Sequence, residues 1–169
     1  MSILQTERLS LDKATEKDAS FFYKLLNSPN WIQFIGDRGI NNEEDALNYI
    51  KNSLIHSYNT FGFGLYKVVL KENNIPVGIC GFVKRDYLNH PDIGFAILPK
   101  YEGNGFAFEA AQEIVNYGLS TLGMEQILGI TTPGNIKSQN LLLKIGLQQV
   151  GFISPDDDQK EHLLFSFNH

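Results

Sequence analysis

The chain has 169 residues with a formal net charge of −5, and 43% of the residues are hydrophobic. This length fits one domain with a sizeable core, and the acidic balance argues against non-specific nucleic-acid binding, which needs a basic surface. The single cysteine, Cys80, excludes an internal disulfide, and its place in the apolar run PVGICGFV predicts that it is buried. We expect no bound metal.

We expect one domain over residues 1–169, located in the cytoplasm and not in a membrane. No apolar run reaches the roughly 20 residues that span a bilayer. The first residues carry acidic side chains and no long apolar segment, unlike a signal peptide.

The first third of the chain predicts one strand followed by two helices. Residues 8–14 (RLSLDKA) alternate between apolar and polar side chains, which is typical of a half-buried strand. In residues 14–29, Thr15 and Asp18 have nearly the spacing of a capping box, and Ser-Pro-Asn ends the predicted helix. Residues 41–57 begin with asparagines and acids, which favour a helix N-terminus.

The remaining elements alternate between strands and helices. Residues 63–87 predict a hairpin with its turn at residues 72–74, and residues 91–99 predict a strand that Pro99 ends. Helices are predicted over residues 106–123 and 135–146, with strands at 124–132, 147–153 and 161–167. This order indicates an α/β fold: a mixed, mostly antiparallel sheet of about seven strands with helices on both faces.

A glycine-containing loop, within LPKYEGNGFAFEAAQ at residues 98–112, joins a predicted strand to a predicted helix. It is either a simple connecting turn or a phosphate site, because a helix N-terminus offers free backbone N–H groups and partial positive charge. The dinucleotide-binding pattern fails, since Phe108 stands at the third glycine position, and the Gly-Lys-Ser/Thr ending of a P-loop is missing. This disfavours a dinucleotide-binding oxidoreductase.

Four segments of the chain carry a family resemblance: TERLSLDKATEKDA (6–19), DIGFAILP (92–99), EGNGFA followed by Phe-Glu-Ala (102–110), and NIKSQNLLLKIGL (135–147). Together they resemble the GNAT superfamily of acetyl-CoA-dependent N-acetyltransferases. The closest likeness is to the branch that contains the ribosomal-protein N-terminal alanine acetyltransferases. They span nearly the whole chain in the family's order, so the resemblance implies a single GNAT-like domain that uses acetyl-CoA as co-substrate.

The resemblance also implies where acetyl-CoA binds. The pyrophosphate is expected on the backbone amides of Gly103, Asn104, Gly105, Phe106, Ala107 and Phe108. The central strand is expected to splay from its neighbour, so that the backbone of Phe95, Ala96 and Ile97 pairs with the pantetheine arm. Asn135 and Ser138 are expected to line the opposite wall, near the thioester.

Two residues depart from the family pattern. Glu102 replaces the usual Gln or Arg, and it weakens CoA binding only if its carboxylate points toward the phosphates. Leu142 replaces a tyrosine that protonates the leaving thiolate in many relatives, so Ser138 becomes the candidate acid. The alternative for Ser138 is that it only helps to cap its helix.

Direct acetyl transfer in a ternary complex requires a base, or a water relay, to take the proton of the acceptor amine. Asp92 is the candidate base, and the alternative is a strand-end residue that caps a turn. His90, Glu161 and His162 are rival candidates. Glu109 is expected to compensate the helix dipole rather than to act in catalysis.

The acceptor is expected to be a primary amine on a protein N-terminus or on a small molecule. Aromatic residues, proposed as substrate-binding, fall in the segments that build the acceptor cleft in relatives; core packing is the alternative for each. They are Trp31, Phe34 and Phe63, with Tyr58 and Phe61 nearby. The acidic turn Asp156–Asp158 either attracts a cationic acceptor or is simply solvated. A catalytically inactive acyl-CoA sensor or interaction module is the alternative function, and a homodimer is left open.

Overall fold

The computed structural model describes residues 2–155 and 160–168. Its strands are β1 (Ser2–Gln5), β2 (Leu9–Asp12), β3 (Leu65–Leu70), β4 (Pro76–Val83), β5 (Asp92–Ile97), β6 (Gln126–Thr131), β7 (Gln148–Ile153) and β8 (His162–Asn168). Its α-helices are α1 (Ala19–Leu26), α2 (Pro29–Phe34), α3 (Glu43–Tyr49), α4 (His56–Phe61), α5 (Phe106–Ser120) and α6 (Ile136–Lys144). Two short 3₁₀ helices are η1 (Glu16–Asp18) and η3 (Pro99–Tyr101), and a π-helical segment, η2 (Ile50–Ile55), joins α3 to α4. The acidic turn Asp156–Asp158 lies outside the described residues.

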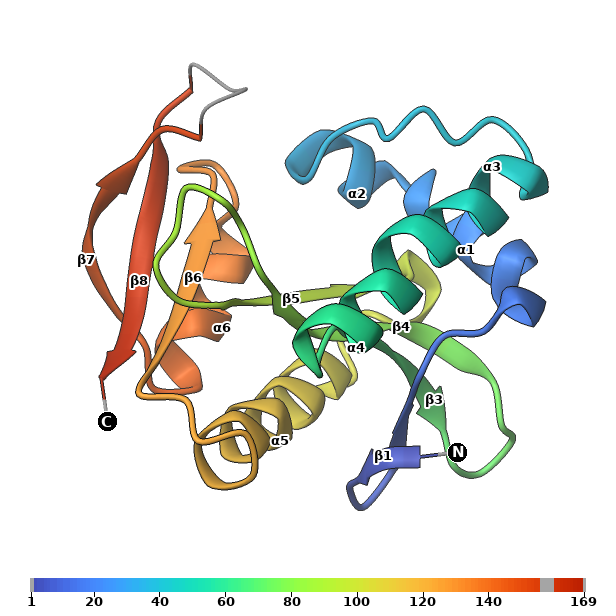
Figure 1. The fold of residues 1–169 in the computed structure, drawn as a ribbon, viewed down its shortest axis with the longest axis horizontal. Coiled ribbons are helices and arrows are strands. Elements are labelled where there is room, and N and C mark those ends of the chain that lie inside the picture. Colours follow the sequence, from blue (N-terminus) through green and yellow to red (C-terminus); the bar gives the residue numbers. More distant parts are fainter. Residues whose placement is uncertain (1, 156–159, 169) are drawn as a thin grey trace.

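The strands form one sheet in the order β1-β2-β3-β4-β5-β6-β8-β7 (Figure 1). Every neighbouring pair is antiparallel except β5 and β6, which are parallel. The predicted mixed, mostly antiparallel sheet is confirmed, with eight strands in place of about seven. The additional strand is β1, an edge strand of four residues whose side chains do not alternate in burial and therefore leave no period of two in the sequence.

The helical segment of the first third begins as predicted and then continues further. The Thr15 side chain and Asp18 form the expected capping box at the start of η1 and α1. The helix ends at Leu26, but Pro29 then opens α2, a short helix that the sequence reasoning did not include. Proline is well placed at a first helical position because its missing N–H would have no helical partner there.

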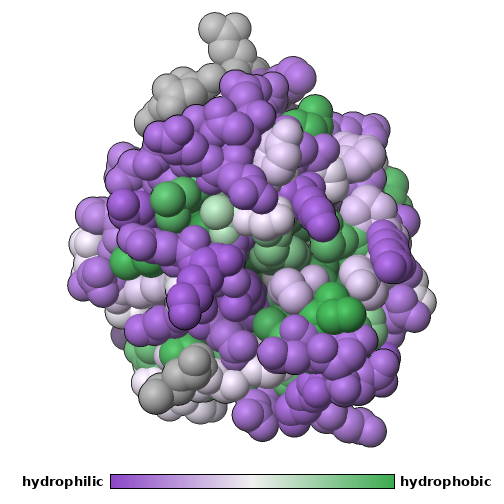
Figure 2. All heavy atoms as spheres, turned by 90° about the vertical axis from the view of Figure 1, so that its right-hand side faces the viewer, coloured by the Kyte–Doolittle hydropathy of each residue, from purple (hydrophilic) through white to green (hydrophobic). Residues whose placement is uncertain are grey.

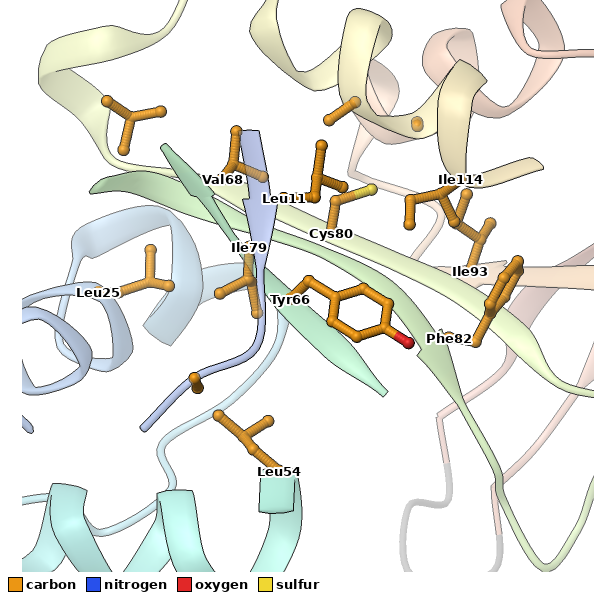
Figure 3. Close-up of a cluster of buried hydrophobic side chains, with 14 of the residues drawn as sticks. Leu11, Leu25, Leu54, Tyr66, Val68, Ile79, Cys80, Phe82, Ile93 and Ile114 are labelled. Carbon is orange, nitrogen blue, oxygen red and sulfur yellow. The ribbon is translucent and has the colours of Figure 1, made fainter. Parts of the chain in front are cut away.

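Helices cover both faces of the sheet, as predicted, with α5 on one face and α1 to α4 on the other (Figure 1). Figure 3 shows the buried side chains in these two layers: Leu11, Cys80 and Ile114 lie on the α5 side, and Leu25 and Ile79 on the opposite side. Cys80 is 1% exposed, which confirms its expected burial. The side of the molecule that carries α1 and α3 is mainly hydrophilic, with small hydrophobic groups near its centre (Figure 2).

No helix in the described part of the chain has the length and apolar character needed to cross a bilayer.

Candidate active site

The neighbouring strands β5 and β6 separate soon after they begin. Only Asp92 of β5 and Leu128 of β6 are paired, next to a hydrogen bond of 3.0 Å from the Leu128 N–H to the Pro91 carbonyl. Beyond this pair, a cleft of about 1050 Å³ is lined by residues 94–97 of β5 and by residues 130–132. The splayed central strand that the resemblance implied is therefore present.

The open edge of β5 presents backbone groups to the cleft. The Leu98 N–H donates to the Val77 carbonyl at 2.8 Å, so residue 98 bonds toward β4. Bonding alternates along an antiparallel ladder. Ala96 therefore also bonds toward β4, whereas the N–H and C=O groups of Phe95 and Ile97 point away from β4. An extended chain can pair with such an edge as an added strand.

The loop between η3 and α5 is shaped by two glycines. Gly103 and Gly105 have φ angles of +81° and +80°, in the left-handed region that favours glycine. No side chain caps α5, and its first backbone bond runs from the Glu109 N–H to the Gly105 carbonyl at 3.0 Å. The N–H groups of residues 106–108 thus lack helical acceptors at the positive end of the helix dipole. Residues 106–108 also line the cleft, so this end of it can bind an anionic group.

Asn104 turns its side chain back onto the loop. Its Nδ2 donates to the Tyr101 carbonyl at 3.0 Å, and its own carbonyl accepts a hydrogen bond of 2.9 Å from Arg8 Nη1. The Arg8 guanidinium also lies 4.6 Å from the centre of the Phe106 ring. These contacts fix the loop and hold a positive charge beside it.

Glu109 joins the start of α5 to the turn before β2. Its carboxylate accepts hydrogen bonds from Arg8 Nε at 2.7 Å, from the Arg8 N–H at 3.0 Å and from the Thr6 hydroxyl. Burial acts to raise the pKa of Glu109, but the hydrogen bonds from Thr6 and Arg8 outweigh it, and the pKa is lowered. Glu109 lies in the first turn of α5, where its charge was expected to compensate the helix dipole, and it also braces the loop. The sequence reasoning missed this second role, although Thr6 and Arg8 lie in a segment that carries the family resemblance.

The Glu102 side chain is held by contacts from two helices. One carboxylate oxygen accepts a hydrogen bond from Asn30 Nδ2 of α2, and the other lies 3.6 Å from Lys137 Nζ of α6. Glu102 lines the cleft beside the glycine loop. Its negative charge is therefore partly offset by Lys137.

The start of α6 also lines the cleft. Asn135 caps this helix through a hydrogen bond of 3.3 Å from the Ser138 N–H to Asn135 Oδ1, and both residues line the cleft. Leu142 is 1% exposed, and a Cβ on Gly129 would approach one of its methyl carbons to 2.8 Å. A buried leucine cannot donate a proton, whereas Ser138 brings a hydroxyl to the cleft.

Asp92 lies at the point where the strands separate. Its side chain is 2% exposed and accepts a hydrogen bond of 2.7 Å from Arg85 Nε. Burial raises the pKa of Asp92, and the neighbouring guanidinium opposes this rise. Of the rival bases, His162 lines the cleft, whereas His90 and Glu161 are not among the described residues that line it.

Of the five aromatic residues that the sequence suggested for the acceptor cleft, Trp31, Phe34 and Phe61 line the cleft. Phe63 is not among the described residues that line the cleft: it is half-buried and packs against the core, with its ring centre 5.9 Å from that of Phe61. Tyr58 is buried, and its hydroxyl accepts a hydrogen bond from the Ala14 N–H, which gives it a structural role.

The sequence reasoning missed a group of residues that line the cleft with Asp92. They are Arg38, Tyr49, Lys84, Arg85 and Tyr87. The sequence contains one signal for them, because Lys84 and Arg85 are adjacent cations directly after the apolar strand β4.

Among residues 2–155 and 160–168, no group of three or more His, Cys, Asp or Glu side chains could hold a metal ion.

Comparisons with known proteins agree with this architecture. The model of the acetyltransferase (GNAT) domain family matches residues 8–148. A Bacillus subtilis protein named "Uncharacterized N-acetyltransferase YoaA" is 28% identical over 153 residues, which cover 89% of this chain and 85% of that protein. The ribosomal protein uS5 alanine N-acetyltransferase of Escherichia coli is 28% identical over 110 residues, which cover 62% of this chain and 55% of that protein.

A solved structure of RimL, a ribosomal L7/L12 α-N-protein acetyltransferase in complex with coenzyme A, has the same fold. The TM-score is 0.80 at 14% identity, and the match covers 99% of this chain and 98% of the other. Because the family model matches most of the sequence, the chain belongs to the GNAT acetyltransferase family and is an acyltransferase.

Proposed function

We propose that the protein transfers an acetyl group from acetyl-CoA to a primary amine, by direct transfer in a ternary complex. The observation that carries this proposal is the position of two binding features in one cleft. The uncapped N-terminus of α5 suits the diphosphate, and the open β5 edge at Phe95 and Ile97 suits the extended pantetheine arm. Family membership, and the coenzyme A in the RimL structure, support the same co-substrate.

The residues of the cleft can serve each step of the transfer. The amine nitrogen forms a bond to the carbonyl carbon of the thioester, and the carbon–sulfur bond breaks. The backbone N–H of Phe95, which points away from β4, donates to the carbonyl oxygen. Asp92, held in place by Arg85, takes the proton that the amine loses. Ser138 gives a proton to the departing sulfur.

The acceptor is a small-molecule amine or a protein N-terminus. The Escherichia coli relative is named for acetylating an alanine of a ribosomal protein. We assign Trp31 and Phe34 to the acceptor wall, where aromatic faces can contact an amine. Phe63 stacks against the cleft-lining ring of Phe61 and holds that ring in position.

Two measurements test the proposal. Acetyl-CoA and CoA should raise the melting temperature, because a ligand that binds only the folded state stabilises it, whereas NAD should not. A thiol-release assay with a panel of amines should then show CoA production. If neither acetyl-CoA nor CoA raised the melting temperature, the proposed co-substrate would be contradicted.

An acyl-CoA-binding module without catalysis is the second candidate. It is favoured by Leu142, an apolar and buried residue in the place where many relatives carry a proton-donating tyrosine. Stabilisation by acetyl-CoA without release of CoA from any amine would support this candidate over the enzyme.

A further inference from the structure

The part of the cleft beside Asp92 carries several positive charges. We call it the acceptor half and define it by Arg38, Lys84, Arg85, Tyr49 and Tyr87, all of which line the cleft. Arg38 follows α2, whereas Lys84 and Arg85 follow β4. The charges of Arg38 and Arg85 both act on Tyr49 and on Tyr87, and Lys84 Nζ donates a hydrogen bond of 3.3 Å to the Arg85 carbonyl. Three cations from two separate segments therefore lie in the same part of the cleft.

Carboxylates in the cleft offset only part of this charge. Among the described residues, the carboxylates that line it are Asp92 and Glu102. Asp92 is engaged by Arg85 at 2.7 Å, and Glu102 lies at the glycine loop, 3.6 Å from Lys137. In the described part of the chain, no ion pair involves Arg38 or Lys84. The acceptor half thus keeps a surplus of positive charge.

The neighbouring acidic and aromatic groups do not remove this surplus. Asp37, next to Arg38 in the sequence, accepts a hydrogen bond from the Gly39 N–H at 2.8 Å and does not line the cleft. Burial raises the pKa of Tyr49, and the charges of Arg38 and Arg85 both oppose that rise. Both guanidinium groups therefore act on the same wall of the cleft.

We infer that the acceptor half binds an amine that also carries an anionic group, either a carboxylate or a phosphate, and that Arg38 and Lys84 hold that group. The inference rests on the proposed function. A guanidinium matches the geometry of both anions through paired N–H donors, and an ammonium adds a point charge. A polyamine would meet like charges here and is rejected for that reason.

Matched pairs of amines test this specificity in the CoA-release assay with the full chain. One pair is 4-aminobutyrate and 4-aminobutanamide, and the other is O-phosphoethanolamine and ethanolamine. Spermidine serves as the cationic comparison. Rates are compared per neutral amine, because the neighbouring group changes the amine pKa. We expect kcat/KM to be about tenfold or more higher for the anionic member of at least one pair, and lowest for spermidine.

Two variants locate the preference in the acceptor half. Arg38→Gln and Lys84→Gln should each lower kcat/KM about fivefold for the preferred anionic amine and by a clearly smaller factor for its neutral counterpart. Lys24→Gln is the matched control, because Lys24 is an exposed cation on α1 that does not line the cleft. Arg85 is left intact, since its removal would leave Asp92 buried without its partner.

The outcomes separate this inference from the proposed function. Equal use of both members, preference for spermidine, or equal losses for both members in the variants would overturn the anionic acceptor while leaving acetyl transfer intact. Absence of turnover with every amine would overturn it as well, and stabilisation by acetyl-CoA would then show that the co-substrate assignment survives. Absence of both turnover and stabilisation means that the proposed function itself fails.

Discussion

The side chains of Arg8 and Glu109, which are 101 positions apart in the sequence, form an ion pair with 2.7 Å between Arg8 Nε and Glu109 Oε1. The pair ties the first turn of α5 to the chain just before β2, and Arg8 also holds the carbonyl of Asn104. The loop assigned to the diphosphate is therefore braced against the sheet on one side before any ligand binds.

Glu109→Ala should lower the free energy of unfolding by about 1–3 kcal/mol, because three hydrogen bonds to a charged group are lost. Urea denaturation at pH 7 measures this change. Glu113→Ala is the matched control, since Glu113 lies one turn further along the same helix and outside the network. Equal losses in the two variants would contradict the bracing role.

The pH dependence of stability, compared between wild type and Glu109→Ala, gives a second test. Burial acts to raise the pKa of Glu109, but hydrogen bonds lower the pKa below the ordinary 4.5. A depressed carboxyl pKa contributes stability that is fully present above the unfolded pKa and is lost as pH falls through the folded one. The stability difference between wild type and Glu109→Ala should therefore shrink below pH 4.5. A difference that stays constant down to pH 3 would argue against the charged contact.

Ser138→Ala should lower kcat about 100-fold while leaving the affinity for acetyl-CoA close to that of wild type, because only proton transfer to sulfur is removed. Ser138→Cys, which keeps a proton donor, should lose less. Ser53→Ala is the control for a cleft hydroxyl outside this role. Unchanged turnover of Ser138→Ala at all pH values would show that Ser138 is not the acid.

Asp92→Asn should slow transfer about 100-fold and flatten the fall of the rate at low pH, after correction for the neutral fraction of the amine. Because burial raises the pKa of Asp92 against the opposing effect of Arg85, the wild-type fall should centre above the ordinary value of 3.8. A pH–rate profile measures both effects. If the rate of the variant fell at low pH in the same way as that of wild type, the proton would be taken by another group.

Cys80 should not react with a thiol reagent in the folded protein. Its side chain is 1% exposed, and burial raises the pKa of its thiol, so that little thiolate is accessible. The reagent used for CoA detection should record one protein thiol only after denaturation. Rapid labelling of the native protein would contradict the buried position and would add background to the transfer assay.

The glycine loop and the start of α5 could be predicted from the sequence more completely than the acceptor half of the cleft. Gly103, Gly105 and the helix after them are local features with a direct physical reading, and they occupy the expected place. Arg38 and Lys84 lie outside helices and strands, where no periodicity indicates that two distant segments meet. The role of Glu109 was likewise hidden, because its partners are set by the tertiary fold.

Binding of acetyl-CoA to a variant at the start of α5 tests the central claim most directly. Ala107 is half-buried and lines the cleft in the first turn of this helix, where an acidic side chain suits the dipole and should preserve the fold. Titration calorimetry should show about tenfold or more weaker binding for Ala107→Glu, because its carboxylate repels the diphosphate, and a smaller loss for Ala107→Gln. Wild-type affinity in Ala107→Glu, or equal losses in both variants, would contradict a diphosphate site at this helix.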